Sequence, residues 1–142
     1  MEIELRISDG ASPEERQAVI GGLVRHNDAA ASPADYRELS VIARAEGEIV
    51  GGLLGWTSWN WLFIAQLWVA EAARGGTGRR LVAEAEQAAI ARGCTHAHVD
   101  TFGFQALPFY RKLGYELFGE LEDYPRGETR YFLQKRNLTS GV

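Results

Sequence analysis

Three glycines within four residues, flanked by arginines, are the part of the sequence best suited to chemistry. This segment follows an apolar run, precedes a helical pattern and consists of Arg74, Gly75, Gly76, Thr77, Gly78, Arg79 and Arg80. A turn with few side chains exposes several backbone N–H groups at the positive end of a helix. The segment therefore predicts a cradle for phosphate groups, although glycines can also serve only to let a strand turn into a helix.

A tyrosine in a short apolar segment is the second candidate. Ala106, Phe109, Tyr110 and Leu113 recur at helical spacing, which is typical of core packing. A tyrosine hydroxyl held beside a reacting group can also donate a proton to it. Tyr110 therefore has two interpretations, a core aromatic residue and a general acid.

A carboxylate and an imidazole share one face of a short predicted strand over 96–102. Asp100 lies at its carboxyl end and His98 two residues earlier. Asp100 is the first candidate for a general base, with a water relay from backbone carbonyls as the alternative. Several aromatic residues could line a pocket for a cation or fill the core, namely Trp56, Trp59, Trp61 and Tyr124.

The elements that must position these residues are predicted from periodicity and turn signals. A capping box at Ser12–Glu15 opens a helix that we expect to fray at Asn27 and Asp28. Further helices are expected from the glycine turn to Gly93 and over 105–113. Strands are predicted over 2–7, 39–45, 49–58, 61–69, 96–102, 115–123 and 129–135. The tail 137–142 is expected to be disordered.

The length and composition of the chain argue against several classes of function. A chain of 142 residues fits a single domain, here 1–136, and its net charge of −4 argues against a nucleic-acid partner. Cys94 is the single cysteine, so the sequence predicts neither a disulfide framework nor a metal site. We expect no membrane partner and a cytoplasmic location, because no apolar run is long enough for a membrane span or signal peptide.

Two common glycine loops fit the segment poorly. A dinucleotide-binding loop would need a third glycine where Leu81 stands, and it would open a parallel unit rather than follow antiparallel strands. A nucleotide-triphosphate loop would need Gly-Lys-Ser or Gly-Lys-Thr, which the segment lacks.

The predicted strand order, the glycine turn and the tyrosine helix together resemble the GNAT superfamily of acetyl-CoA-dependent N-acetyltransferases, from Ile3 to about Arg136. Gly76 and Gly78 match the family's loop, Arg/Gln-x-x-Gly-x-Gly/Ala, but Ala73 stands where Arg or Gln is expected. The resemblance implies a mixed α+β fold: a mostly antiparallel twisted sheet of about seven strands, helices on both faces and a splayed central strand pair. A homodimer is a further family-level expectation.

Site residues are also implied by the resemblance. The loop from Arg74 to Arg80 would hold the coenzyme pyrophosphate, and the central strand would pair with the pantetheine arm. Tyr110 would be the acid at the thioester sulfur. The other residues implied to bind the cofactor are Leu67, Trp68, Val69, Gln105 and Lys112.

The function expected on these grounds is acetyl transfer from acetyl-CoA to a primary amine of a small molecule, by direct attack in a ternary complex and without a metal. Two alternatives remain at this point. One is a non-catalytic acyl-CoA-binding or regulatory module, and the other is an acetyltransferase of protein amino groups.

Overall fold

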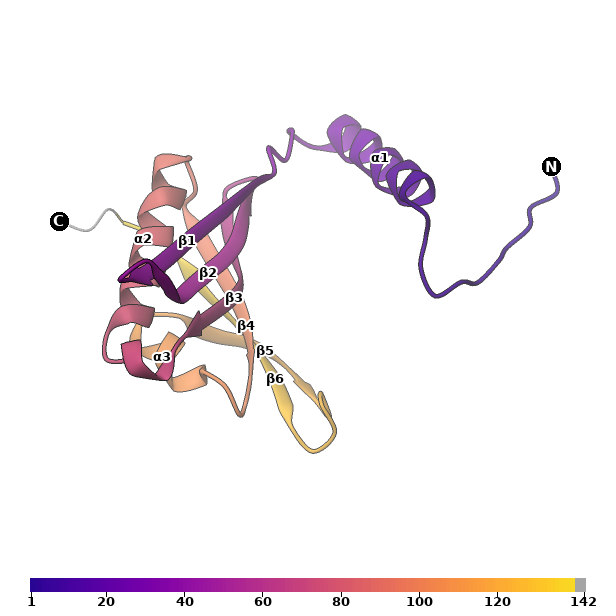
Figure 1. The fold of residues 1–142 in the computed structure, drawn as a ribbon. Coiled ribbons are helices and arrows are strands. Elements are labelled where there is room, and N and C mark those ends of the chain that lie inside the picture. Colours follow the sequence, from indigo (N-terminus) through magenta and orange to yellow (C-terminus); the bar gives the residue numbers. More distant parts are fainter. Residues whose placement is uncertain (140–142) are drawn as a thin grey trace. The chain divides into compact units, whose positions relative to one another are not determined.

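The computed structural model describes residues 1–139 and divides the chain into two compact units, Met1–Ala34 and Asp35–Val142. Figure 1 shows the elements of both units. Among the described residues, no helix combines the length and apolar character that crossing a bilayer requires. Every candidate site residue belongs to the second unit.

The first unit contains one helix, α1 (Pro13–Ala30). The predicted capping box is present, since the Ser12 hydroxyl accepts a hydrogen bond from the Glu15 amide and the Glu15 carboxylate accepts one from the Ser12 amide. The helix does not fray at Asn27 and Asp28 but continues to Ala30. The Ala31 amide donates to the Asn27 carbonyl, so the last turn keeps its hydrogen bonding.

The predicted strand over 2–7 is wrong. These residues have no secondary structure, and Ile3, Leu5 and Ile7 are exposed. Alternation specifies which side chains share a face, but a strand forms only where another strand accepts its backbone hydrogen bonds. The sheet therefore has six strands rather than about seven.

The second unit is built on that six-stranded sheet, in the order β1-β2-β3-β4-β6-β5. Its strands are β1 (Arg37–Ala45), β2 (Glu48–Ser58), β3 (Trp61–Val69), β4 (His96–Phe102), β5 (Glu116–Glu122) and β6 (Thr129–Arg136). All neighbouring pairs are antiparallel except β3 and β4, which run parallel. The mixed, mostly antiparallel sheet expected from the sequence is confirmed.

The central pair is splayed, as expected. β3 and β4 stay in register from Trp61↔His96 to Ile64↔Val99, and no pairing follows, although β3 continues to Val69 and β4 to Phe102. Beyond Ile64, the edge of β3 that would face β4 keeps backbone N–H and C=O groups without a partner strand. Such an edge can pair with an extended ligand that carries amides.

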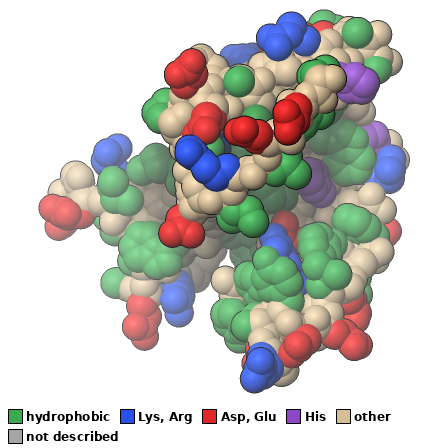
Figure 2. Space-filling model, turned by 90° about the vertical axis from the view of Figure 1, so that its right-hand side faces the viewer, with side chains coloured by type: hydrophobic (Ala, Val, Ile, Leu, Met, Phe, Trp, Pro, Cys, Tyr) green, Lys and Arg blue, Asp and Glu red, His purple; other side chains and the backbone are tan. Residues whose placement is uncertain are grey.

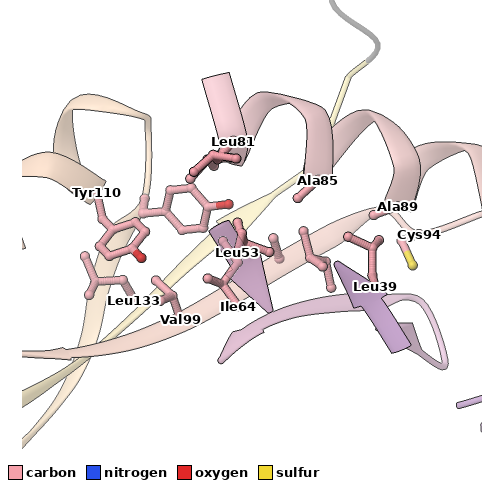
Figure 3. Packing of buried hydrophobic residues seen from close by; sticks show 14 residues of the cluster. Leu39, Leu53, Ile64, Leu81, Ala85, Ala89, Cys94, Val99, Tyr110 and Leu133 are labelled. Atoms are coloured by element: carbon pink, nitrogen blue, oxygen red, sulfur yellow. The ribbon is translucent and has the colours of Figure 1, made fainter. Parts of the chain in front are cut away.

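Two helices, α2 (Thr77–Ala91) and α3 (Leu107–Lys112), contribute to one core on one face of the sheet. Figure 3 shows Leu81, Ala85 and Ala89 of α2 packed over Leu53, Ile64 and Val99 of the strands, with Tyr110 at one end. Helix α3 begins at Leu107 rather than at the predicted Gln105. The Gln105 side chain instead accepts hydrogen bonds from the Phe102 amide and the Thr101 hydroxyl.

The end of the chain is held against the sheet as far as it is described. The Asn137 amide donates to Nδ1 of His96, and the Leu138 amide donates to the Thr95 carbonyl. Leu138 also packs against the hydrophobic core. The rest of the tail that the sequence predicts to be disordered, 140–142, lies outside the described residues.

Candidate active site

The glycine turn forms the predicted cradle at the start of α2. Gly75 and Gly76 adopt φ values of +111° and +123°, a backbone region that side chains disfavour. Gly76 is the N-cap of α2 and no side chain caps this end. The first intrahelical amide with a backbone acceptor is that of Arg80, which donates to the Gly76 carbonyl. The amides of the first turn are therefore left for an anion.

A cavity of about 620 Å³ opens beside this cradle. It brings together most of the residues predicted to bind the cofactor: Leu67, Trp68, Val69, Arg74, Gly75, Gly76, Gly78 and Arg79. Ala106 and Phe109 form its wall on the side of α3. An apolar wall beside unpaired amides and two guanidinium groups suits a ligand that is part thioalkyl arm and part diphosphate.

Besides two that line a cleft between β3 and β4, three of the predicted cofactor residues lie outside this cavity. Arg80 lines a separate cavity with Glu84 and residues of β1, so its side chain lies away from the cradle. Thr77 donates its hydroxyl to the Ala73 carbonyl at 2.6 Å and stabilises the turn. Lys112 is exposed at the end of α3 and lines none of the cavities described.

A second cavity of about 410 Å³ lies where β3 and β4 diverge. Leu67 and Trp68 line both this cleft and the glycine-loop cavity, so the two adjoin each other along β3. Asp100, Gln105 and Tyr110 complete the cleft. The two predicted catalytic residues therefore lie together in the same opening, next to the predicted coenzyme cavity.

The position of Tyr110 fits both interpretations from the sequence, a core aromatic residue and a general acid. It is only 4% exposed, and its ring makes edge contacts with Phe109 and Tyr115. Burial, with a smaller contribution from the negative charge of Asp100, raises its pKa from 10.0 to about 12. The hydroxyl makes no hydrogen bond to any residue in the described part of the chain, so it can bind a ligand group as a protonated donor.

Asp100 is fixed by an arginine that sequence reasoning missed. Nε and one terminal nitrogen of Arg130 both donate to Oδ1 of Asp100, at 3.0 and 2.6 Å. The other terminal nitrogen donates to the Tyr124 hydroxyl at 2.9 Å, and the guanidinium lies 4.9 Å from the Tyr124 ring centroid. Arg130 thus ties the turn between β5 and β6 to the mouth of the cleft. Opposite charges on adjacent strands were the available signal, but the β4–β6 pairing was not predictable.

The predicted substrate residues divide among three places on the face of the sheet opposite α2. Trp59 and Trp61 line a cavity of about 400 Å³ with His98 and Phe118. Trp56 lines another, of about 300 Å³, that also includes Ala65 and Gln66 of β3. Tyr124 lies instead beside Arg130. Figure 2 shows this side of the molecule, where hydrophobic and histidine side chains reach the surface.

His98 lies among aromatic rings, with the Phe63 ring centroid 4.6 Å away and that of Trp61 5.6 Å away. Burial lowers the pKa of His98, partly offset by the negative charge of Asp100. The lowered value favours the neutral imidazole at physiological pH. Cys94 is buried, which raises its thiol pKa, so it belongs to the core rather than to the reaction.

A bulge in β3 is the other feature that sequence reasoning missed. The pairing with β2 shifts between Leu54↔Gln66 and Gly55↔Ile64, which leaves Ala65 as an extra residue. Gly55 permits this close approach, because a Cβ at that position would overlap the Phe63 carbonyl oxygen. The bulge lies where β3 begins to separate from β4, so it helps to open the cleft. A glycine inside a predicted strand was its only signal in the sequence.

The cradle, the splayed strands and the buried tyrosine define an acyl-CoA-dependent acyltransferase. The chain belongs to the Acetyltransferase (GNAT) family, whose model matches residues 9–115. The resemblance expected from the sequence is confirmed, and the protein is an enzyme of this acyltransferase class.

One of the comparisons extends over nearly all of the chain, and two others extend over about two thirds of it. A crystal structure of an acetyltransferase from Agrobacterium tumefaciens has a TM-score of 0.87 and 35% identity, covering 94% of this chain and 99% of the other. Blasticidin-S acetyltransferase of Streptomyces morookaense is 46% identical over 91 residues, which are 63% of this chain and 67% of that protein. A streptothricin acetyltransferase from Bacillus anthracis, solved with acetyl coenzyme A, shares the fold with a TM-score of 0.63 and 23% identity, covering 70% of this chain and 62% of the other.

Proposed function

We propose that the protein transfers the acetyl group of acetyl-CoA to a primary amine of a small molecule, by direct attack within a ternary complex. The observation that carries the proposal is that the glycine-loop cavity adjoins the cleft lined by Asp100 and Tyr110, with Leu67 and Trp68 in the wall of both. The diphosphate of the thioester would lie at Gly76 and its arm along Leu67 and Trp68. Its carbonyl carbon would then lie between the side chains of Asp100 and Tyr110.

The size of the cavities on the sheet face opposite α2 favours a small acceptor. The cavities lined by Trp56 and by Trp61 measure about 300 and 400 Å³, which is the scale of small-molecule pockets. The relative from Streptomyces morookaense, 46% identical, is named for acetylating blasticidin S. A relative that is named for acetylating a small molecule supports a small amine, rather than a protein, as the acceptor of this enzyme.

The proposed reaction needs three proton movements. The amine nitrogen, once neutral, attacks the thioester carbonyl carbon, the carbon–sulfur bond breaks, and the departing thiolate takes the proton of the Tyr110 hydroxyl. The nitrogen of the new amide then loses its second proton, which returns to the Tyr110 oxygen. The acceptor begins as an ammonium, and a lysine-like amine is neutral in only about one molecule in 2,500 at pH 7. We propose that Asp100 accepts its proton, directly or through water, because its carboxylate lines the cleft.

A thiol-release assay with acetyl-CoA and a panel of small amines and peptides tests this proposal. We expect coenzyme A to be released with small primary amines and not with peptides. Release with peptides alone would replace the small acceptor with a protein amino group, and coenzyme binding without release from any amine would leave a non-catalytic binder.

Replacing Asp100 with asparagine tests the base. We expect Asp100→Asn to lower kcat/KM about 100-fold at pH 7 and to recover much of it at alkaline pH, where the amine is already neutral. Unchanged kcat/KM at pH 7 would show instead that water bound to backbone carbonyls removes the proton. Glu116→Gln on β5, exposed and outside the cleft, is the matched control.

A further inference from the structure

One carboxylate residue and two aromatic residues line the smaller cavity on the face opposite α2. Glu38 of β1 lines this space of about 300 Å³ with Tyr36 and Trp56. The rings of Tyr36 and Trp56 lie 5.8 Å apart between centroids, tilted by 40°. None of these features is needed to bind acetyl-CoA or to move its acetyl group.

The register of the sheet fixes the direction of the Glu38 side chain. Glu38 is paired with Trp56 across the β1–β2 ladder, and paired residues project from the same face of a sheet. The next residue, Leu39, points the opposite way, into the core beneath α2, and is 4% exposed. Glu38 therefore faces the aromatic cavity and not the core.

The charge of Glu38 is not neutralised by the protein. Among residues 1–139 the ion pairs join Arg130 to Asp100 and Lys135 to Glu86, and no hydrogen bond engages the Glu38 carboxylate. A negative charge and aromatic rings that line the same cavity attract a cation by two effects, Coulomb attraction and the quadrupole of the rings. The cavity thus suits an ammonium or guanidinium group better than a neutral one.

The cavity adjoins the cleft where acetyl transfer is proposed. Ala65 and Gln66, at the bulge of β3, line both spaces. Two strand spacings separate β1 from β3, which places the backbone of Glu38 about 10 Å from that of the bulge. A single small molecule can therefore reach from one space to the other.

We infer that Glu38, with Tyr36 and Trp56, binds a second cationic group of the acceptor, an ammonium or guanidinium about 10 Å or less from the amine that is acetylated. The inference rests on the proposed function and specifies its substrate class. The acceptor is then at least dicationic, with a spacer of about four to six bonds between its two charged groups.

Direct binding and turnover with two probes of equal length test the inference. The probes are 1-amino-4-guanidinobutane, which carries the second cation, and 1-(4-aminobutyl)urea, which carries a neutral urea there. With coenzyme A present, we expect calorimetry to show at least tenfold tighter binding of the guanidino probe by the wild type. Glu38→Gln should bring the ratio close to one, with the KM for the guanidino probe raised and kcat nearly unchanged.

Glu48→Gln is the charge-matched control. Glu48 begins β2, is exposed and lines neither the cleft nor the aromatic cavity, so the preference should persist in this variant. A preference that survives in Glu38→Gln, or its absence from the wild type, would overturn the cationic subsite even where both probes are acetylated. Binding that depends on Glu38 without thiol release would support the subsite and overturn the proposed function.

Discussion

Tyr110 illustrates how one residue can serve both packing and chemistry. Its ring is part of the buried core, and Figure 3 shows it near Val99 and Leu133, yet it also lines the cleft. Burial penalises the phenolate, so the hydroxyl keeps its proton over the whole physiological range. A donor that remains protonated, and that no described residue engages, is suited to protonating a leaving thiolate.

Replacing Tyr110 with phenylalanine should preserve the core and remove the acid. We expect kcat to fall by a factor of about 10²–10⁴, with little change in the KM for acetyl-CoA. Because the pKa of Tyr110 is raised to about 12, the wild-type rate should rise as the amine deprotonates and show no decline from this group below about pH 11. Steady-state kinetics from pH 6 to about 11 measure both effects.

Tyr115→Phe is the matched control for that experiment. Tyr115 is also buried, but its hydroxyl donates to Glu86 at 2.7 Å and does not line the cleft. The control should lose some stability and keep most of its kcat. Equal losses of kcat in the two variants would assign Tyr110 a packing role only.

At the scale of elements, the site depends on two departures from regular structure. The glycine turn follows β3 and a short 3₁₀ helix (Glu71–Ala73) and starts α2 without a side-chain cap. The bulge at Ala65 lies where β3 leaves β4. Regular pairing would use the backbone groups that we propose bind the coenzyme. Both departures depend on glycines, Gly76 in the turn and Gly55 opposite the bulge.

Gly55→Ala tests whether the bulge is needed. The new Cβ would overlap the Phe63 carbonyl oxygen, and a backbone group in the middle of a sheet cannot move aside. We expect a loss of about 2–3 kcal/mol in the free energy of unfolding, from denaturant titration, and a larger proportional loss of kcat/KM.

Gly119→Ala provides the comparison, because a Cβ at Gly119 meets its nearest atom, in Phe132, at an ordinary 3.9 Å. This variant should remain close to the wild type in stability and turnover. If Gly55→Ala behaves in the same way, the bulge can relax and does not shape the cleft.

At the scale of the whole molecule, the sequence predicted the bounds of the strands better than it predicted which strands pair with each other. Strands β3 and β4 have the bounds expected from their apolar pattern, because local periodicity reports the buried face directly. The strand predicted over 2–7 has the same alternation but does not form. Strand formation depends on a partner far away in the chain, and a local pattern contains no information about it.

In the candidate site too, residues that form a local pattern were predicted and residues placed by strand pairing were missed. Contiguous residues, such as Gly75 to Arg79, were predicted from the sequence because their chemistry is local. Arg130 was missed, since it reaches Asp100 only through the pairing of β4 with β6. Glu38 was missed for the same reason, because its place beside Trp56 is set by the β1–β2 register.

The buried tyrosines predict how the stability of the molecule depends on pH. Burial raises the pKa of Tyr110 to about 12 and also raises that of Tyr115. A raised pKa means that the folded state holds the proton after the unfolded state has released it. The stabilisation is therefore complete below pH 10 and is lost as pH rises toward 12, by up to about 3 kcal/mol for Tyr110.

Urea titrations at pH 9, 10 and 11 measure this dependence. The free energy of unfolding of the wild type should fall more steeply with pH than that of Tyr110→Phe, which no longer titrates at this position. Parallel curves for the two proteins would show that Tyr110 ionises as easily in the folded state as in the unfolded chain.

The central claim is that the amides at the start of α2 bind the coenzyme diphosphate, and calorimetric titration with coenzyme A tests it most directly. Gly76→Val should weaken binding at least 100-fold, because a branched side chain is strained at a φ of +123° and would displace those amides. Gly47→Val, at a φ of +82° in the β1–β2 turn, carries similar strain outside the site and should bind like the wild type. Wild-type affinity in Gly76→Val, or no binding by the wild type, would contradict the account.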